Sequence, residues 1–151
     1  ENIYFSAIII IIFSFDRISK LEIINKFNQS SYYVNDFINL DLIWNTGIGF
    51  GIFSTDSNLL YNLISFTIGS VIIILMYALI VSKKIDKLIY SIIIGGALGN
   101  FYDRILYKAV PDFIDLHYGN FHWFTFNLAD IFITMGILIF ICSIFFVDNE
   151  K

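Results

Sequence analysis

Apolar residues fall into four long runs along the chain, and most charged residues lie between these runs or at their ends. The runs cover approximately residues 3–20, 59–81, 85–107 and 128–147. A helix rises about 1.5 Å per residue, so about 20 mostly apolar residues cross the hydrocarbon core of a bilayer. The pattern therefore predicts an all-α membrane protein with four transmembrane helices, in a single integral-membrane domain that covers residues 1–151.

The first run has a competing interpretation. Its most apolar part, Ile3 to Phe15, is short enough to be the core of a signal peptide. No small-residue cleavage site follows, because the next residues are Asp16 and Arg17, with Lys20 close behind. We therefore predict that this run is a spanning helix.

The composition favours lipid as the surrounding solvent. Apolar residues make up 58% of the chain and charged residues only 15%, too few to cover the surface of a soluble domain. The 17 Phe and 9 Tyr agree, because amphipathic rings favour membrane interfaces. A net charge of −4 leaves no basic patch for phosphates, which argues against nucleic acid as a partner. The single cysteine excludes an intrachain disulfide and a cysteine-based metal site.

The lysines predict how the chain is oriented. Lys83, Lys84 and Lys87 crowd the short link between the second and third runs, and the positive-inside rule places such a link in the cytoplasm. With four spans, both termini lie on that same side. Two longer connections, residues 17–58 and 108–127, then face outward. Alternating apolar positions within residues 32–43 predict short strands in the first of them.

Ionisable side chains in or near the runs gather at the outward end. Such groups are costly in a membrane, so each one requires a physical explanation. By the predicted orientation they all lie near one interface, as the residues of a membrane-embedded site would. They are Asp16, Arg17, Lys20, Asp103, Arg104, Asp112 and Asp130.

The third run places three site candidates on one helical face. Gly96, Asn100 and Arg104 recur at every fourth position. The structural alternative is helix packing together with an interfacial anchor made by Asp103 and Arg104. Asp103 is a third candidate carboxylate for catalysis, and we rank it below Asp112 and Asp130 because its neighbour Arg104 offers it a structural partner.

Two further carboxylates form a candidate catalytic pair. Asn127 is a good N-cap for the fourth run, and Asp130 then lies at the third helical position, where the helix end favours an anion. Asp112 follows Pro111 in what we expect to be a loop. Each residue alone has an ordinary structural explanation. Two carboxylates in a partly desolvated site share a proton, so one can act as base on a water and the other as acid.

Other functional interpretations have less support in the sequence. His117 and His122 lack a HExxH frame, so we predict no metal site and treat them as interfacial side chains. A transporter that uses Asp130 or Asp103 as a proton relay is an alternative, although a relay acid belongs near the middle of the bilayer. A non-catalytic assembly subunit, packed through small residues of the third run, is another, but it leaves Asp112 unexplained.

Five sequence blocks together resemble the signal peptidase II (lipoprotein signal peptidase) family. They occur in the family order and span nearly the whole chain. They are DRISK at 16–20, NTGIGF at 45–50, GGALGNFYDR at 95–104, VPDF at 110–113 and FNLAD at 126–130.

This resemblance implies a four-helix aspartic endopeptidase of the bacterial inner membrane, with both termini cytoplasmic. It implies a small periplasmic β-cradle and a short periplasmic helix or loop. The implied substrates are diacylglyceryl-modified prolipoproteins, cut on the N-terminal side of the lipidated cysteine, and globomycin is the implied inhibitor. We further expect contact with membrane lipid, no cofactor, and a monomer.

The resemblance also implies roles for individual residues. The catalytic dyad falls on Asp112 and Asp130. Two positions depart from the family blocks: Gly49 replaces an alanine, and Pro111 replaces a valine and stiffens the approach to Asp112. The positions that match substrate-binding or supporting ones are Asp16, Lys20, Asn45, Gly47, Gly96, Asn100, Asp103, Arg104, Asn127 and Ala129.

Overall fold

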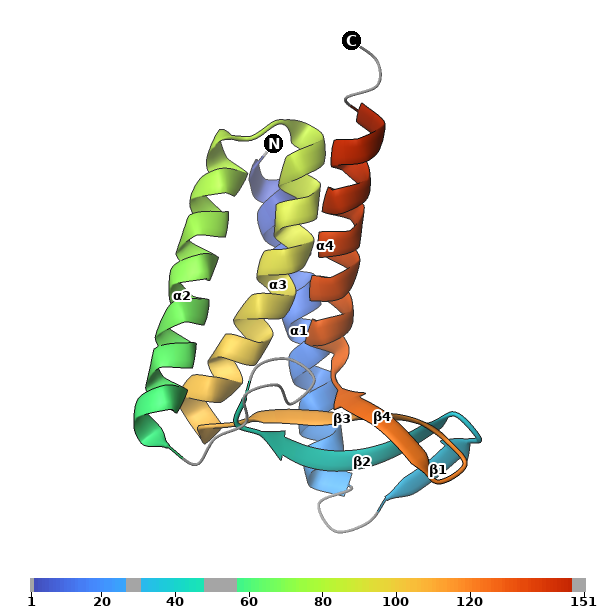
Figure 1. Ribbon diagram of the computed structural model, residues 1–151. Helices are drawn as coiled ribbons and strands as arrows, with labels where there is room; N and C mark the ends of the chain where they lie inside the picture. The colour runs from blue at the N-terminus through green and yellow to red at the C-terminus, as the bar shows by residue number, and fades with distance from the viewer. Residues whose placement is uncertain (1, 27–30, 48–56, 148–151) are drawn as a thin grey trace.

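The computed structural model describes residues 2–26, 31–47 and 57–147, and four long helices dominate this part of the chain (Figure 1). The helices stand side by side, with the start of the first and the end of the last at the same end of the bundle. Each follows one of the apolar runs, so the prediction of four helices is confirmed. They are α1 (Asn2–Lys26), α2 (Asn58–Val81), α3 (Lys84–Tyr107) and α4 (Leu128–Val147).

Helices α2 and α4 are long and apolar enough to cross a membrane. Only 6% of the apolar window of α2 and 17% of that of α4 is buried inside the protein, so these helices do not belong to the core of a soluble domain. Large apolar side chains such as Phe66 and Ile73 instead point outward. Helices α1 and α3 carry charged residues in their length, which is why composition alone does not mark them as spans.

Helix α1 is longer than predicted. We expected it to end near residue 20, but it continues to Lys26. Two ion pairs with i,i+4 spacing, Asp16 with Lys20 and Glu22 with Lys26, stabilise its second half. Ile23 is buried and helps to hold this extension in place. The first outward connection is therefore shorter than the sequence suggested.

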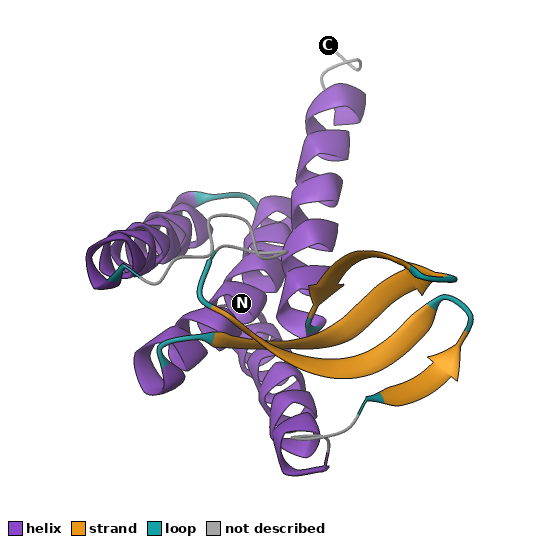
Figure 2. Cartoon of the chain, turned by 60° about the horizontal axis from the view of Figure 1, so that its bottom comes forward, coloured by secondary structure: helices purple, strands orange, loops and turns teal. Residues whose placement is uncertain are grey.

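A four-stranded antiparallel sheet lies at one end of the bundle (Figure 2). The expected strands in the first connection are confirmed as β1 (Tyr32–Asn35) and β2 (Ile38–Asn45). The implied short helix has no counterpart among the described residues, and residues 48–56 lie outside them. The strand order is β1-β2-β3-β4.

The second connection is not the loop that we predicted. It forms a hairpin of β3 (Val110–Tyr118) and β4 (Phe121–Phe126). A two-residue turn at Gly119 and Asn120 joins the strands, and Gly119 has a φ of 60°, which glycine adopts without strain. Aromatic and β-branched residues on both sides of a Gly-Asn pair are a hairpin signal that we overlooked.

Helix α3 is at the centre of the bundle and packs against all three other helices. The close approach of α1 and α4 to α3 depends on glycine residues in α3. A Cβ atom at Gly96 would lie 2.6 Å from the backbone oxygen of Ala129 in α4. A Cβ at Gly99 would collide with the carboxylate of Asp16 in α1. These contacts bring the polar parts of three helices together at the end that meets the sheet.

Candidate active site

Asp112 lies near the start of β3, in a strand rather than in the predicted loop. Its side chain is only 2% exposed, and both carboxylate oxygens accept hydrogen bonds from amide groups. Asn45 Nδ2 donates to Oδ2 at 2.9 Å, and Asn127 Nδ2 donates to Oδ1 at 2.6 Å. Pro111 pairs with Trp44, and the pairing of β3 with β4 begins only at Ile114. The missing N–H of the proline therefore breaks no ladder bond on the β4 side.

Asp130 lies in the first turn of α4, as predicted, and is buried. Asn127 Oδ1 accepts from the backbone N–H of Asp130 at 3.1 Å, and Asp130 Oδ2 accepts from the backbone N–H of Asn127 at 3.2 Å. These two bonds form a reciprocal helix cap. The other carboxylate oxygen, Oδ1, accepts from Asn100 Nδ2 at 2.8 Å. The side chain of Asp130 is thus fixed by two helices.

Asn127 joins the two carboxylates. Its side chain binds Asp112, while its backbone and side-chain oxygen bind Asp130. Burial, and to a smaller extent the nearby charge of Asp130, raise the pKa of Asp112 to about 7. Asp112 and Asp130 are thus two buried carboxylates that share Asn127 as a partner, and Asp112 holds its proton near neutral pH. Such a pair is able to divide the acid and base roles between its members.

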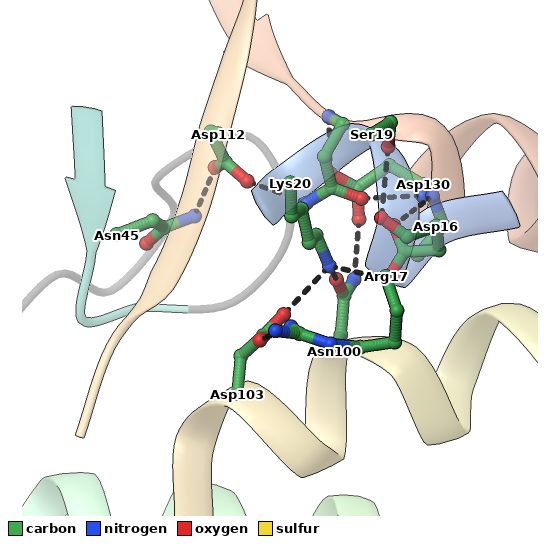
Figure 3. A network of polar contacts seen from close by, with 11 residues as sticks. Asp16, Arg17, Ser19, Lys20, Asn45, Asn100, Asp103, Asp112 and Asp130 are labelled. Atoms are coloured by element: carbon green, nitrogen blue, oxygen red, sulfur yellow. Dashed lines mark hydrogen bonds and ion pairs between the residues drawn. The ribbon is translucent and has the colours of Figure 1, made fainter. Parts of the chain in front are cut away.

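A charged cluster lies beside the pair (Figure 3). Lys20 is completely buried, and its Nζ lies 2.7 Å from Asp16 Oδ2 and 2.7 Å from Asp103 Oδ2. Arg17 pairs with the other oxygen of Asp103. Our expectation that Arg104 would be the partner of Asp103 is therefore wrong, because consecutive helical residues point in different directions. Two cations balance two carboxylates in this cluster.

The charged cluster is connected to the carboxylate pair. Lys20 Nζ donates to Asn100 Oδ1 at 2.8 Å, and the amide nitrogen of the same Asn100 donates to Asp130. Asp16 Oδ1 accepts from the backbone N–H of Ala129 at 3.0 Å. Helix α1 thus holds the first turn of α4, and α3 sets the orientation of Asp130.

Arg104 reaches the segment that follows β2. Its guanidinium donates to the backbone oxygen of Gly47, and its own backbone oxygen accepts from the Tyr61 hydroxyl at 2.9 Å. Two buried guanidinium nitrogens, Nε and Nη1, have no hydrogen-bond partner among the described residues. Arg104 therefore has hydrogen-bond donors that the described residues leave unused.

The structure brings together the described parts of all five sequence blocks. Sequence reasoning missed two site features, Arg17 as partner of Asp103 and Tyr61 as partner of Arg104. It also missed a cluster on the sheet, in which Asp115 lies beside His117 and His122. Asp115 and His117 are two residues apart, which places both on one face of a strand. A hairpin predicted at residues 110–126 would therefore have indicated that they lie near His122.

The helices have an apolar outer surface, and two buried carboxylates lie at the end of the bundle that meets the sheet. These features are typical of a helical membrane enzyme. Comparison with known proteins gives the particular family. The family model described as signal peptidase (SPase) II matches residues 8–146. This chain therefore belongs to the signal peptidase II family, which is a family of peptidases.

Individual relatives agree with this family. The lipoprotein signal peptidase of Pelagibacter ubique (strain HTCC1062) is 46% identical over 155 residues, which cover 100% of this chain and 93% of the relative. That of Anaplasma marginale (strain Florida) is 39% identical over 139 residues, or 89% of this chain and 79% of the relative. A bacterial membrane enzyme solved by the in meso method at 2.3 Å resolution superposes with a TM-score of 0.79 at 31% identity, covering 98% of this chain and 92% of that chain.

Proposed function

We propose that this protein is an aspartic endopeptidase that removes signal peptides from diacylglyceryl-modified prolipoproteins, cutting on the N-terminal side of the lipidated cysteine. The observation that carries the proposal is the pair of buried carboxylates, Asp112 and Asp130, held by the same residue, Asn127. The names of the relatives supply the substrate class.

All four helices cross the bacterial inner membrane in this proposal. The charged side chains of α1 and α3 that would oppose insertion, such as Lys20 and Asp103, are buried and paired inside the bundle. Apolar side chains such as Ile10 and Ile105 point outward from the same helices. By the positive-inside rule, the lysines between α2 and α3 support a cytoplasmic location for that end of the bundle and for both termini. The sheet and the carboxylate pair then lie at the periplasmic face.

The reaction needs one ionised and one protonated carboxyl group. Asp130 accepts two N–H donors in the first turn of a helix, an arrangement that favours its ionised form. Its carboxylate takes a proton from a water held between the pair, and the water oxygen bonds to the carbonyl carbon of the peptide. Asp112 gives its proton to the carbonyl oxygen. When the carbon–nitrogen bond breaks, the leaving amine takes the proton from Asp130, and Asp112 recovers its own.

The surrounding residues position the substrate in this scheme. Arg104, two of whose guanidinium nitrogens have no partner among the described residues, binds a backbone carbonyl of the signal peptide. Asn45 fixes the orientation of the Asp112 carboxylate, and Asn100 fixes that of Asp130. The diacylglyceryl chains stay in lipid while the scissile bond enters at the interface. A single copy of the chain contains every group that the reaction uses, so we propose that it acts as a monomer.

A cleavage assay tests the function directly. Purified protein in detergent is incubated with a peptide whose lipobox cysteine carries diacylglycerol, and the products are identified by mass spectrometry. We expect one cut, immediately before the lipidated cysteine, and inhibition by globomycin. The same peptide without the lipid serves as control and should be cut poorly. Absence of cleavage by protein with a normal thermal transition would contradict the proposal.

The rate of cleavage should fall as the pH rises through about 7. The pKa of Asp112 is raised to about 7 by burial and by the charge of Asp130, so its proton, which the reaction uses as acid, is present below that pH and lost above it. The measurement is kcat/KM between about pH 5 and pH 9, because this ratio reports the free enzyme. The lipidated peptide should contain no histidine or free amine, so that only the enzyme titrates. A ratio that keeps rising to about pH 9 would mean that Asp112 is not the acid.

A further inference from the structure

The hairpin of β3 and β4 carries a second group of polar side chains, made of Asp115, His117 and His122, which is separate from the carboxylate pair. One ligand atom from each residue can be chosen so that all three lie within 4.8 Å of one another. His122 Nδ1 lies 2.7 Å from Asp115 Oδ2, and His117 Nδ1 lies 3.7 Å from the same oxygen. The two rings are stacked, with their centroids 5.3 Å apart.

Burial makes this cluster unusual. Asp115 and His117 are both 5% exposed. The Nδ1 atom of His117 is buried and has no hydrogen-bond partner among the described residues, although it faces the Asp115 carboxylate. A buried nitrogen without a partner costs free energy unless something else binds it. A cation that accepts its lone pair would satisfy it.

The backbone holds two of the three residues firmly. Asp115 lies in a central strand, opposite Asn39 on one side and Thr125 on the other. His117 pairs with His122, and its backbone N–H donates to Phe37 O at 2.9 Å. His122 is different, because its side chain is 55% exposed. Its ring can therefore turn without disturbing the core, and water reaches the site from that side.

We propose that Asp115, His117 and His122 bind a divalent transition-metal cation, with Zn²⁺ as the best match. Two imidazoles and one carboxylate are ligands that Zn²⁺ prefers, whereas Mg²⁺ and Ca²⁺ prefer oxygen alone. In a tetrahedral zinc site the ligand atoms lie about 3.3 Å apart. The two separations from Asp115 Oδ2, 2.7 and 3.7 Å, lie on either side of that value. Water on the exposed side of His122 would complete the coordination.

The bound cation would link β3 to β4. Asp112 lies three residues before Asp115 on β3, and Asn127 directly follows β4. The cation would therefore stabilise the hairpin that holds one catalytic carboxylate and leads to the other, without contact with substrate. The alternative is that Asp115 simply accepts a hydrogen bond from His122, in which case Zn²⁺ has no specific site here.

The experiment uses the full chain, purified without a histidine tag and treated with a chelator that is then removed. Because the sequence contains only two histidines, a histidine-dependent signal comes from this cluster. Zn²⁺ binding is measured by titration calorimetry, and Co²⁺ is used as a spectroscopic probe of tetrahedral nitrogen and oxygen ligands. We expect one Zn²⁺ per chain, and a thermal transition that rises with Zn²⁺ concentration.

Two variants and two controls decide the outcome. His122→Ala removes an exposed ligand without disturbing the fold and should weaken Zn²⁺ binding at least about 100-fold. Asp115→Asn should weaken it as well. Asp41→Asn, an exposed carboxylate on β2, should leave it unchanged, and so should Asp112→Asn in the carboxylate pair. No saturable binding to the unmodified chain, or equal binding to His122→Ala, would overturn the proposal.

Discussion

Asp112→Asn and Asp130→Asn should each reduce cleavage of the lipidated peptide by at least about 10³-fold. Acid–base catalysis by one positioned side chain contributes about 10² to 10⁴ to a rate, and here each carboxyl group serves in both halves of the reaction. An amide of the same size keeps the volume of the buried side chain but cannot exchange a proton. The loss should therefore appear in kcat, with little change in the binding of the peptide.

The controls for this pair come from the same chain. Asp41→Asn changes an exposed carboxylate on β2 and should keep full activity. Asn127→Asp, in contrast, would place a third carboxylate between the pair and should also inactivate the enzyme. Thermal transitions of all variants are measured, so that loss of the fold is not mistaken for loss of chemistry. Full activity of either dyad variant at normal expression would remove that residue from the mechanism.

The largest effect on stability should come from Lys20→Met. Lys20 is completely buried and pairs with both Asp16 and Asp103. Methionine keeps the length of the side chain but leaves Asp16 as a buried charge without a cation. Removing one partner of a buried ion pair costs about 3 to 5 kcal/mol. Activity should fall too, because Asn100, which binds Asp130, loses the hydrogen bond from Lys20.

Helix α1 provides a matched control for this change. Lys26 pairs with Glu22 at the same i,i+4 spacing, but both side chains are more than half exposed. Solvent screens such a pair, so Lys26→Met should change the free energy of unfolding by less than about 0.5 kcal/mol. Both free energies are measured by reversible unfolding in mixed micelles of constant composition. Equal effects of the two substitutions would show that burial of Lys20 does not matter for stability.

The contrast between α1 and the hairpin shows where local sequence is informative. Apolar runs and their ends determine helices, so the helices were predicted with small errors at the boundaries. The extension of α1 to Lys26 was missed because the charged residues Asp16, Arg17 and Lys20 interrupt the apolar run. The hairpin of β3 and β4 was missed because its alternation is short and is interrupted by a bulge between Leu116 and His117.

The sequence by itself determined the four helices, the cap of α4 and the family, since these depend on local spacing and on the order of short motifs. Only the tertiary structure decided which charges meet. Arg17 and Asp103 are 86 residues apart in the chain, and Asn45 and Asp112 are 67 apart. Helical spacing says which face a side chain occupies, but not which helix or strand packs against that face. The tertiary structure therefore decided that Asp103 pairs with Arg17 and Lys20, and that Asp115 lies beside two histidines.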